Sequence, residues 1–171
     1  MPSLLRHKRF DQVVRAYSGE LFRFAYWLCR DRFVAEELVQ ETFTRAWRNW
    51  DALLDPDNPK PWLVTILRNE HARLYERKQL DYVDAQPEEL ELPAEHQPVE
   101  LYELEDLIGS LPLSLREPFL LQVLGGFSCA EIGAMLDISE GAVMVRLTRA
   151  RQSLRQHLDA APGTQAARKS S

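Results

Sequence analysis

Residues 127–158, FSCAEIGAMLDISEGAVMVRLTRARQSLRQHL, restrict the fold of this chain more than any other segment. Apolar residues recur there at helical spacing, and Ser128 precedes Glu131 by three positions, as in a capping box. The stretch Asp137 to Ser139 interrupts this pattern, and Ser139 can cap a second helix. The segment therefore predicts a helix-turn-helix. Asp137 stands where many helix-turn-helix proteins have a glycine in the turn, so its backbone must adopt the left-handed conformation.

The second helix of this motif has two different faces. Steps of about 100° per residue place an apolar set on one buried stripe: Val143, Leu147, Ala150, Leu154 and Leu158. The opposite face carries small, uncharged or basic residues and no carboxylate: Gly141, Ala142, Val145, Thr148, Arg149 and Gln152. Such a face can approach base edges and phosphates in a DNA major groove. The alternative is a surface helix whose arginines are only solvated.

The composition is that of a soluble globular protein. A length of 171 residues with 45% hydrophobic residues allows one large domain or two small ones. The apolar runs are short and no secretory leader is evident, so we expect no membrane insertion and a location in the cytoplasm. Cys29 and Cys129 lie far apart without metal-ligand spacing, so both are expected to be small buried hydrophobes, and no metal or other cofactor is expected.

Charge is distributed unevenly along the chain. Residues 1–80 carry 14 basic and 11 acidic residues, residues 81–106 carry no basic and 10 acidic residues, and residues 107–171 carry 7 basic and 5 acidic residues. Two mildly basic parts therefore flank an acidic middle. The overall charge of −5 does not exclude binding to nucleic acid.

The pattern predicts an all-α protein with two small helical domains joined by a flexible acidic linker, the second domain containing the helix-turn-helix. Helices are expected at 8–30, 32–50, 61–78, 101–109 and 113–124, before the two helices of the motif. The predicted boundaries are 1–80 for the first domain, 81–100 for the linker and 101–158 for the second domain. Residues 159–171 lack a periodic pattern and are expected to be a disordered tail.

The predicted helix 35–50 has a core stripe made of Val39, Phe43, Ala46, Trp47 and Trp50. Leu38 lies outside this stripe, on a side that is otherwise polar. It is either an isolated surface leucine or an apolar knob that docks on a partner. Periodicity leaves both possibilities open.

The predicted helix 61–78 buries Leu63, Ile66, Leu67 and Leu74. Its other side is polar and aromatic, with Arg68, Asn69 and Tyr75. Aromatic rings beside arginine and amide groups can stack on unpaired bases and hydrogen-bond their edges. For Trp62, a position in the core is the favoured interpretation.

Three segments occur in the order found in the extracytoplasmic-function (ECF) group of sigma factors, which are promoter-recognition subunits of bacterial RNA polymerase. The chain resembles this family in EELVQETFTRAWRNW, in PWLVTILRNEHARLYERK and in the stretch from LPLSLREPF to RQSLRQHL. The resemblance covers nearly everything except the tail. It implies a non-enzymatic factor that binds core RNA polymerase through the clamp coiled coil and the flap. Promoter recognition, −10 melting and transcription initiation would follow, with promoter DNA and an anti-sigma factor as further partners.

The resemblance also assigns residues to three sites. The clamp coiled coil of polymerase would meet Leu38, Gln40, Glu41 and Thr44. The melted −10 element would meet a loop from Leu53 to Lys60 and the helix after it, through Asn58, Lys60, Trp62, Arg68, Asn69 and Arg73. The −35 element would meet Glu140, Gly141, Ala142, Val145, Arg146 and Arg149.

The start of the second motif helix departs from the family pattern. Many relatives carry G-T-V-K-S-R there, whereas this chain has GAVMVR over 141–146. A lysine and two hydroxyls are missing. Val145 could contact a thymine methyl but cannot donate a hydrogen bond, so direct readout depends on Arg146 and Arg149 or on DNA shape.

Two other function classes would make different demands on the sequence. A dimeric helix-turn-helix regulator that does not join polymerase would need a dimer interface or ligand pocket in residues 1–80. An enzyme would need a catalytic constellation, but the four histidines are scattered and no HExxH or Ser/His/Asp arrangement occurs. We therefore expect no catalysis.

Overall fold

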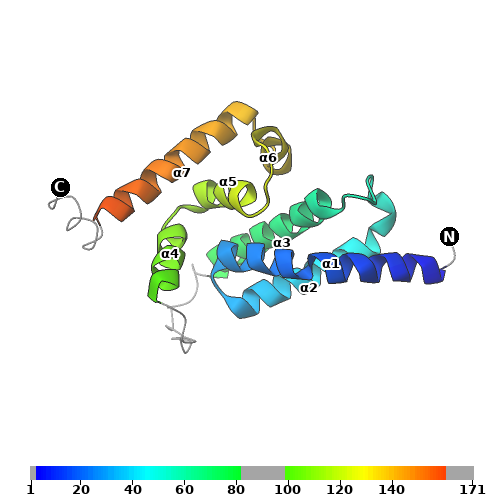
Figure 1. Ribbon diagram of the computed structural model, residues 1–171. Helices are drawn as coiled ribbons and strands as arrows, with labels where there is room; N and C mark the ends of the chain where they lie inside the picture. Colours follow the sequence, from blue (N-terminus) through cyan, green and yellow to red (C-terminus); the bar gives the residue numbers. More distant parts are fainter. Residues whose placement is uncertain (1–2, 82–98, 161–171) are drawn as a thin grey trace. The chain divides into compact units, whose positions relative to one another are not determined.

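The computed structural model describes residues 3–81 and 99–160, and every regular element in these two ranges is a helix (Figure 1). The predicted all-α fold is confirmed. The chain divides into two compact units, Met1–Pro93 and Ala94–Ser171. Most of the predicted linker and nearly all of the predicted tail lie outside the described residues. Among the described helices, none combines the length and the apolar character needed to cross a membrane.

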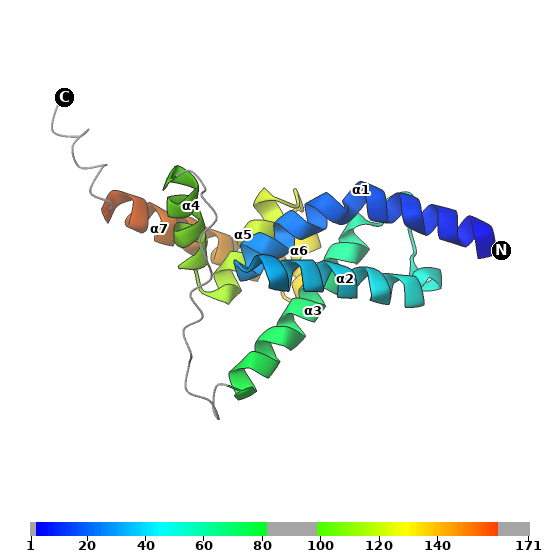
Figure 2. The same cartoon turned by 90° about the horizontal axis from the view of Figure 1, so that it is seen from below.

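The first unit contains α1 (Ser3–Cys29), α2 (Arg32–Arg48), the short 3-10 helix η1 (Trp50–Ala52) and α3 (Lys60–Asp81). The three α-helices contact one another pairwise, and α1 and α2 lie side by side in both views (Figures 1 and 2). The break expected between the helices 8–30 and 32–50 is confirmed and falls at Arg30 and Asp31. Arg30 adopts a left-handed conformation with a φ of 56°, and the Asp31 carboxylate accepts hydrogen bonds from the backbone N–H groups of Phe33 and Val34. This cap starts α2 in a new direction.

The buried side of α2 differs from the predicted stripe. Ala35, Leu38, Thr42 and Ala46 are buried, whereas Val39, Phe43, Trp47 and Trp50 are half-buried. Leu38 has only 4% of its surface exposed, so its placement on the polar side was wrong. The physical reason is that α2 packs against both α1 and α3, which buries a wider arc of the helix than one stripe. The Thr42 hydroxyl is satisfied in this core because it donates to the Leu38 carbonyl oxygen at 2.6 Å.

On α3, burial of Leu63 and Leu67 is confirmed, whereas Ile66 and Leu74 are only half-buried. The core also takes in three residues that periodicity did not select, namely Val64, Glu70 and His71. Since α3 contacts both α1 and α2, its buried side is likewise wider than a single stripe.

An aromatic cluster joins α1, α2, η1 and the start of α3. The ring of Phe10 lies 5.0 Å from that of Trp47 and 5.3 Å from that of Trp50, and Trp50 lies 6.3 Å from Trp62, all edge-to-face. The Arg6 guanidinium lies 4.8 Å above the Trp47 ring. Trp62 is half-buried, so it belongs partly to this cluster and not to a closed core. These contacts fix both ends of the loop between η1 and α3.

The second unit contains α4 (Val99–Gly109), α5 (Leu113–Val123), α6 (Cys129–Leu136) and α7 (Glu140–Ala160). Helices α5, α6 and α7 contact one another, and α4 contacts α7 (Figure 1). Their core is aliphatic, with one aromatic ring, and contains Ile108, Leu111, Leu120, Leu121, Phe127, Ile132, Leu136, Val143, Leu147 and Ala150.

The helix-turn-helix is confirmed, with its caps. The Ser128 hydroxyl accepts from the Glu131 N–H at 3.2 Å, and the Glu131 carboxylate accepts from the Ser128 N–H at 2.7 Å. Asp137 is left-handed, with φ 55° and ψ 46°. The Ser139 hydroxyl accepts from the Ala142 N–H at 3.1 Å and caps α7. The turn is tight enough that a Cβ on Gly133 would lie 2.8 Å from the Ile138 carbonyl oxygen, which explains the glycine.

Several other positions depart from the predicted burial, and Leu154 of the α7 stripe is only half-buried. Leu158 is 52% exposed and not buried, because α7 is much longer than α5 and α6 and its last turns extend past the core. Cys29 and Cys129 are half-buried and not fully buried. Burial still raises the pKa of the Cys29 thiol, which donates to the Asp31 carbonyl oxygen at 3.3 Å, so this cysteine stays protonated at neutral pH. No cluster of potential metal ligands occurs in the ranges that the structure describes.

Candidate polymerase and DNA interfaces

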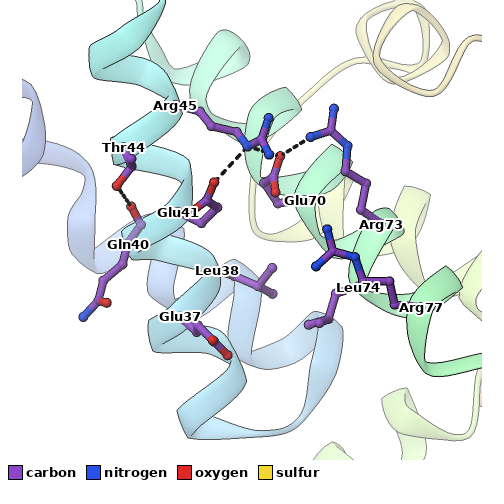
Figure 3. Close-up of a pocket in the computed structure, with 10 residues that line it drawn as sticks. All are labelled: Glu37, Leu38, Gln40, Glu41, Thr44, Arg45, Glu70, Arg73, Leu74 and Arg77. Carbon is purple, nitrogen blue, oxygen red and sulfur yellow. Dashed lines mark hydrogen bonds and ion pairs between the residues drawn. The ribbon is translucent and has the colours of Figure 1, made fainter. Parts of the chain in front are cut away.

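A groove with a volume of about 480 Å³ lies between α2 and α3 (Figure 3). All four residues predicted to meet the polymerase clamp line it, namely Leu38, Gln40, Glu41 and Thr44. Leu38 forms part of its floor and points toward Leu74 of α3. The structure thus brings this predicted set together, although Leu38 lies at the bottom of a hollow and not on a protruding knob.

The two walls of the groove carry opposite charges. Glu37, Glu41 and Arg45 line it from α2, whereas Glu70, Arg73 and Arg77 line it from α3, so the net charge is negative on the α2 side and positive on the α3 side. A partner that fits here needs an apolar group for the floor and charges that match both walls. Such a surface suits a protein partner better than a nucleic acid, whose phosphates are repelled by the carboxylates.

Glu70 connects the two helices beneath these walls. Its carboxylate lies 2.6 Å from Arg45 Nε on α2 and 3.0 Å from a terminal guanidinium nitrogen of Arg73 on α3. Arg45 also contacts Glu41 at 3.0 Å. Only 10% of the Glu70 side chain is exposed, and a buried carboxylate is stable only with such partners. The network therefore holds the spacing of α2 and α3, which sets the width of the groove.

Sequence patterns missed Glu70, Arg45 and Leu74 as members of this site. The i,i+4 spacing of Glu41 and Arg45 was visible as a pair along one helix. The contact from Arg45 to Glu70 joins residues 25 positions apart, and helical periodicity carries no signal for it.

The residues predicted for the −10 element are divided by the structure into three places. Asn58 is exposed in the loop before α3, and Lys60 is half-buried, with its Nζ 3.3 Å from a Glu20 carboxylate oxygen. Trp62 lies against Trp50 in the aromatic cluster. Helical spacing puts Asn69 on the side of α3 that carries Trp62, and a guanidinium nitrogen of Arg68 contacts the Asn69 side-chain oxygen at 3.3 Å.

Arg73 belongs to the α2–α3 groove, because its guanidinium is held by Glu70 and lines the hollow. The structure therefore does not group Arg73 with the loop residues. In the loop before α3, Leu54 has 98% of its surface exposed, which the sequence pattern did not indicate.

The residues predicted for the −35 element lie on the first three turns of α7. Glu140, Gly141, Val145 and Arg149 are exposed, whereas Ala142 and Arg146 are half-buried. Thr148 and Gln152 are exposed as well. In the described part of the chain, no ion pair engages Arg146 or Arg149. Met144 was not assigned to this site, yet it is 56% exposed beside Val145.

Two family descriptions match the chain, one in each unit. Sigma-70 region 2 matches residues 13–80, and Sigma-70, region 4 matches residues 101–154. The first match covers the groove and the loop before α3, and the second covers the helix-turn-helix.

Similar proteins are named as ECF RNA polymerase sigma factors. "ECF RNA polymerase sigma factor SigE" of Mycolicibacterium smegmatis is 33% identical over 158 residues, which are 87% of this chain and 61% of that protein. "ECF RNA polymerase sigma factor EcfG" of Rhodopseudomonas palustris is 31% identical over 148 residues, which are 84% of this chain and 81% of that protein. The chain thus spans less than two thirds of SigE and about four fifths of EcfG.

Solved structures agree with this assignment. The sigma factor RpoE from Bartonella quintana, in complex with the anti-sigma factor NepR, gives a TM-score of 0.75 at 30% identity and covers 90% of this chain and 98% of that one. CnrH in complex with the cytosolic domain of CnrY gives a TM-score of 0.67 at 28% identity, covering 92% and 96%. The first unit matches region 2, the second unit matches region 4, and the chain is 31% identical to EcfG over most of both chains. The protein therefore belongs to the ECF family of RNA polymerase sigma factors.

Proposed function

We propose that this chain binds core RNA polymerase and directs it to promoters, where it recognises the −35 element, melts the −10 element and starts transcription. The observation that carries the proposal is the presence, in one chain, of a mixed-charge groove in region 2 and an exposed face without carboxylates on the recognition helix of region 4. The two surfaces differ in chemistry, as a protein partner and a DNA partner require.

The α2–α3 groove is the proposed contact for the polymerase clamp coiled coil. A helix laid along the groove can place an apolar side chain over Leu38 and Leu74. Basic groups on that helix would meet Glu37, and acidic groups would meet Arg77, because Glu41 and Arg73 are already held by Arg45 and Glu70. This charge pattern favours one orientation of the partner helix over the reverse one.

The loop between η1 and α3 and the exposed side of α3 are the proposed contacts for the −10 element. Asn58 and Asn69 are exposed and can hydrogen-bond base edges, and the half-buried Trp62 offers part of a ring for stacking. Extruding a base costs a few kcal/mol, which such contacts can offset. In this proposal the duplex opens through binding energy alone, and the chain catalyses no reaction.

The outward face of α7 is the proposed contact for the −35 element. The first turns of a recognition helix contact base edges in the major groove. Here these turns carry Val145 and Arg149 on the exposed side, and the arginines, which have no ion pair within the described ranges, can meet guanine or phosphate. We also propose a second contact of this unit with the polymerase flap.

The proposal also covers the acidic segment between the units, the location of the protein and a further partner. The domains 1–80 and 101–158 act as separate binding units tethered by residues 81–100, and the protein works in the cytoplasm. In the solved structures, RpoE is in complex with the anti-sigma factor NepR, and CnrH is in complex with the cytosolic domain of CnrY. These complexes support an anti-sigma protein as a further partner of this chain.

Reconstitution tests the proposed function. Full-length protein is mixed with bacterial core polymerase and genomic fragments, and transcription starts are mapped. We expect new starts that share two upstream elements at a fixed spacing, in contrast to core polymerase alone. A dimer in size-exclusion chromatography together with starts identical to those of core alone would instead support a regulator that acts without joining polymerase.

A further inference from the structure

The centre of the α7 face that would meet DNA is apolar. Val145 is 49% exposed and Met144 is 56% exposed. A single exposed apolar residue needs no explanation on most surfaces. Val145, however, stands in the middle of the outward face, one turn after Gly141 and one turn before Arg149. A base that contacts the centre of this face therefore contacts an apolar side chain.

Thr148 adds to this apolar centre. Its hydroxyl donates to the Met144 carbonyl oxygen of the same helix at 2.9 Å. The only hydrogen of that hydroxyl is therefore used within α7, and the side chain has no further donor for a base. Its methyl group remains at the exposed face. Between Gly141 and Thr148, Arg146 is therefore the one side chain that can still donate a hydrogen bond to a base.

Gly141 lets this face come close to a partner. A Cβ built at this position meets no atom within 4 Å, and its φ is not in the left-handed range, so the fold does not require glycine here. The missing side chain leaves the backbone uncovered one turn before Val145. Because valine is short, it reaches a base edge only where the backbone can approach the groove floor closely.

Major-groove chemistry selects one base for such a surface. Thymine alone among the four bases presents a methyl group there, whereas the other edges present donors and acceptors that lose water without gaining a partner. Building on the proposed function, we infer that Val145, flanked by Met144 and Thr148, contacts a thymine C5-methyl group in the −35 duplex and makes thymine the preferred base at that position. Arg146 and Arg149 supply the charge that holds the helix on the DNA.

The test removes the methyl group from the DNA and not from the protein. Holoenzyme made from core polymerase and the full chain selects duplexes from a random library, and each thymine of the selected −35 element is then replaced by uracil, one at a time. We expect a loss of affinity of about fourfold at one or two positions, which is the effect of burying a single methyl group.

Two variants complete the design. Val145→Ser is expected to bind the thymine and uracil duplexes equally. Val123→Ser makes the same change at a position of α5 that is 59% exposed and outside the α7 face, and it is expected to keep the discrimination. Since both positions are exposed, thermal unfolding should be nearly unchanged in either variant.

The inference is overturned if uracil at every position leaves the affinity of the wild type unchanged, or if Val145→Ser retains the preference for thymine. A holoenzyme that enriches no duplex at all contradicts the proposed function, and with it the inference. The two failures therefore give different results in the same experiment.

Discussion

The α2–α3 groove and the outward face of α7 are both charged surfaces, but their charges are organised in different ways. In the groove, Arg45 and Arg73 are already paired with Glu70, so these cations shape the surface. On α7, Arg146 and Arg149 have no ion pair in the ranges that the structure describes. Charges satisfied inside the protein define a shape for a protein partner, whereas unsatisfied cations remain available for phosphates and guanine.

The largest expected effect concerns the floor of the groove. Leu38→Asp should lower the free energy of unfolding of the first unit by at least about 3 kcal/mol, because it removes a packed side chain and buries a carboxylate without a partner. Phe33→Asp is the matched control, since Phe33 lies on the same helix but is 69% exposed, whereas Leu38 is 4% exposed. Chemical denaturation of both variants measures the difference; equal destabilisation would place Leu38 outside the core.

Arg149→Ala addresses the other surface. We expect binding to the selected −35 duplex to weaken by about 1–3 kcal/mol, because the substitution removes an exposed guanidinium from its contact with base or phosphate. Arg155→Ala removes an exposed arginine further along α7 and should have a smaller effect. Titration at several salt concentrations distinguishes a base contact from a phosphate contact, since loss of a phosphate contact also lowers the salt dependence of binding. Equal losses for both variants would argue against a specific role for Arg149.

Glu37→Lys reverses one charge on the acidic wall of the groove. Association with core polymerase should weaken about tenfold, or about 1.4 kcal/mol, while binding to the −35 duplex by the full chain stays unchanged. Glu36→Lys is a close control, because Glu36 is the neighbouring exposed residue but does not line the groove. Since Glu36 contacts Arg32 at 3.6 Å on the surface, its reversal should cost little stability. A tenfold loss in the control would show that overall charge, and not the groove, controls association.

Gly141→Ala gives the smallest expected effect and separates stability from binding. The added methyl group meets no atom, so the free energy of unfolding should rise by about 0.5 kcal/mol through the lower entropy of the unfolded chain. Duplex binding should nevertheless weaken a few fold, because the methyl group keeps the backbone next to Val145 further from the groove floor. Thermal unfolding and duplex titration of the same preparation measure both. A variant that is more stable and binds equally well would remove the role given to this glycine.

Local signals in the sequence predicted the seven α-helices of the described residues, but neither the short helix η1 nor the start of α1 at Ser3. The break at Asp31, the capping box at Ser128 and the left-handed turn at Asp137 depend on residues within four positions of one another. Side-chain chemistry at these positions fixes where a helix starts or ends, and the structure confirms each of them. The exposed face of α7 could also be predicted, because one side of this helix packs on its unit and the other does not.

Features that depend on packing between helices could not be predicted in this way. Leu38 was placed on the polar side because periodicity describes one buried face, whereas α2 has neighbours on two sides. The Arg45–Glu70 contact joins different helices, and the exposure of Leu158 depends on how far α7 extends past α5 and α6. Each of these is a property of the assembled unit and leaves no mark in the local pattern.

One paired binding experiment tests the central claim that the two surfaces serve different partners. Association with core polymerase and binding of the free full chain to the selected −35 duplex are measured in parallel for the wild type, Glu37→Lys and Arg149→Ala. The account predicts that Glu37→Lys loses affinity only for polymerase and that Arg149→Ala loses affinity only for the duplex. If either variant lost both affinities to the same degree, the division of labour between the groove and α7 would be contradicted.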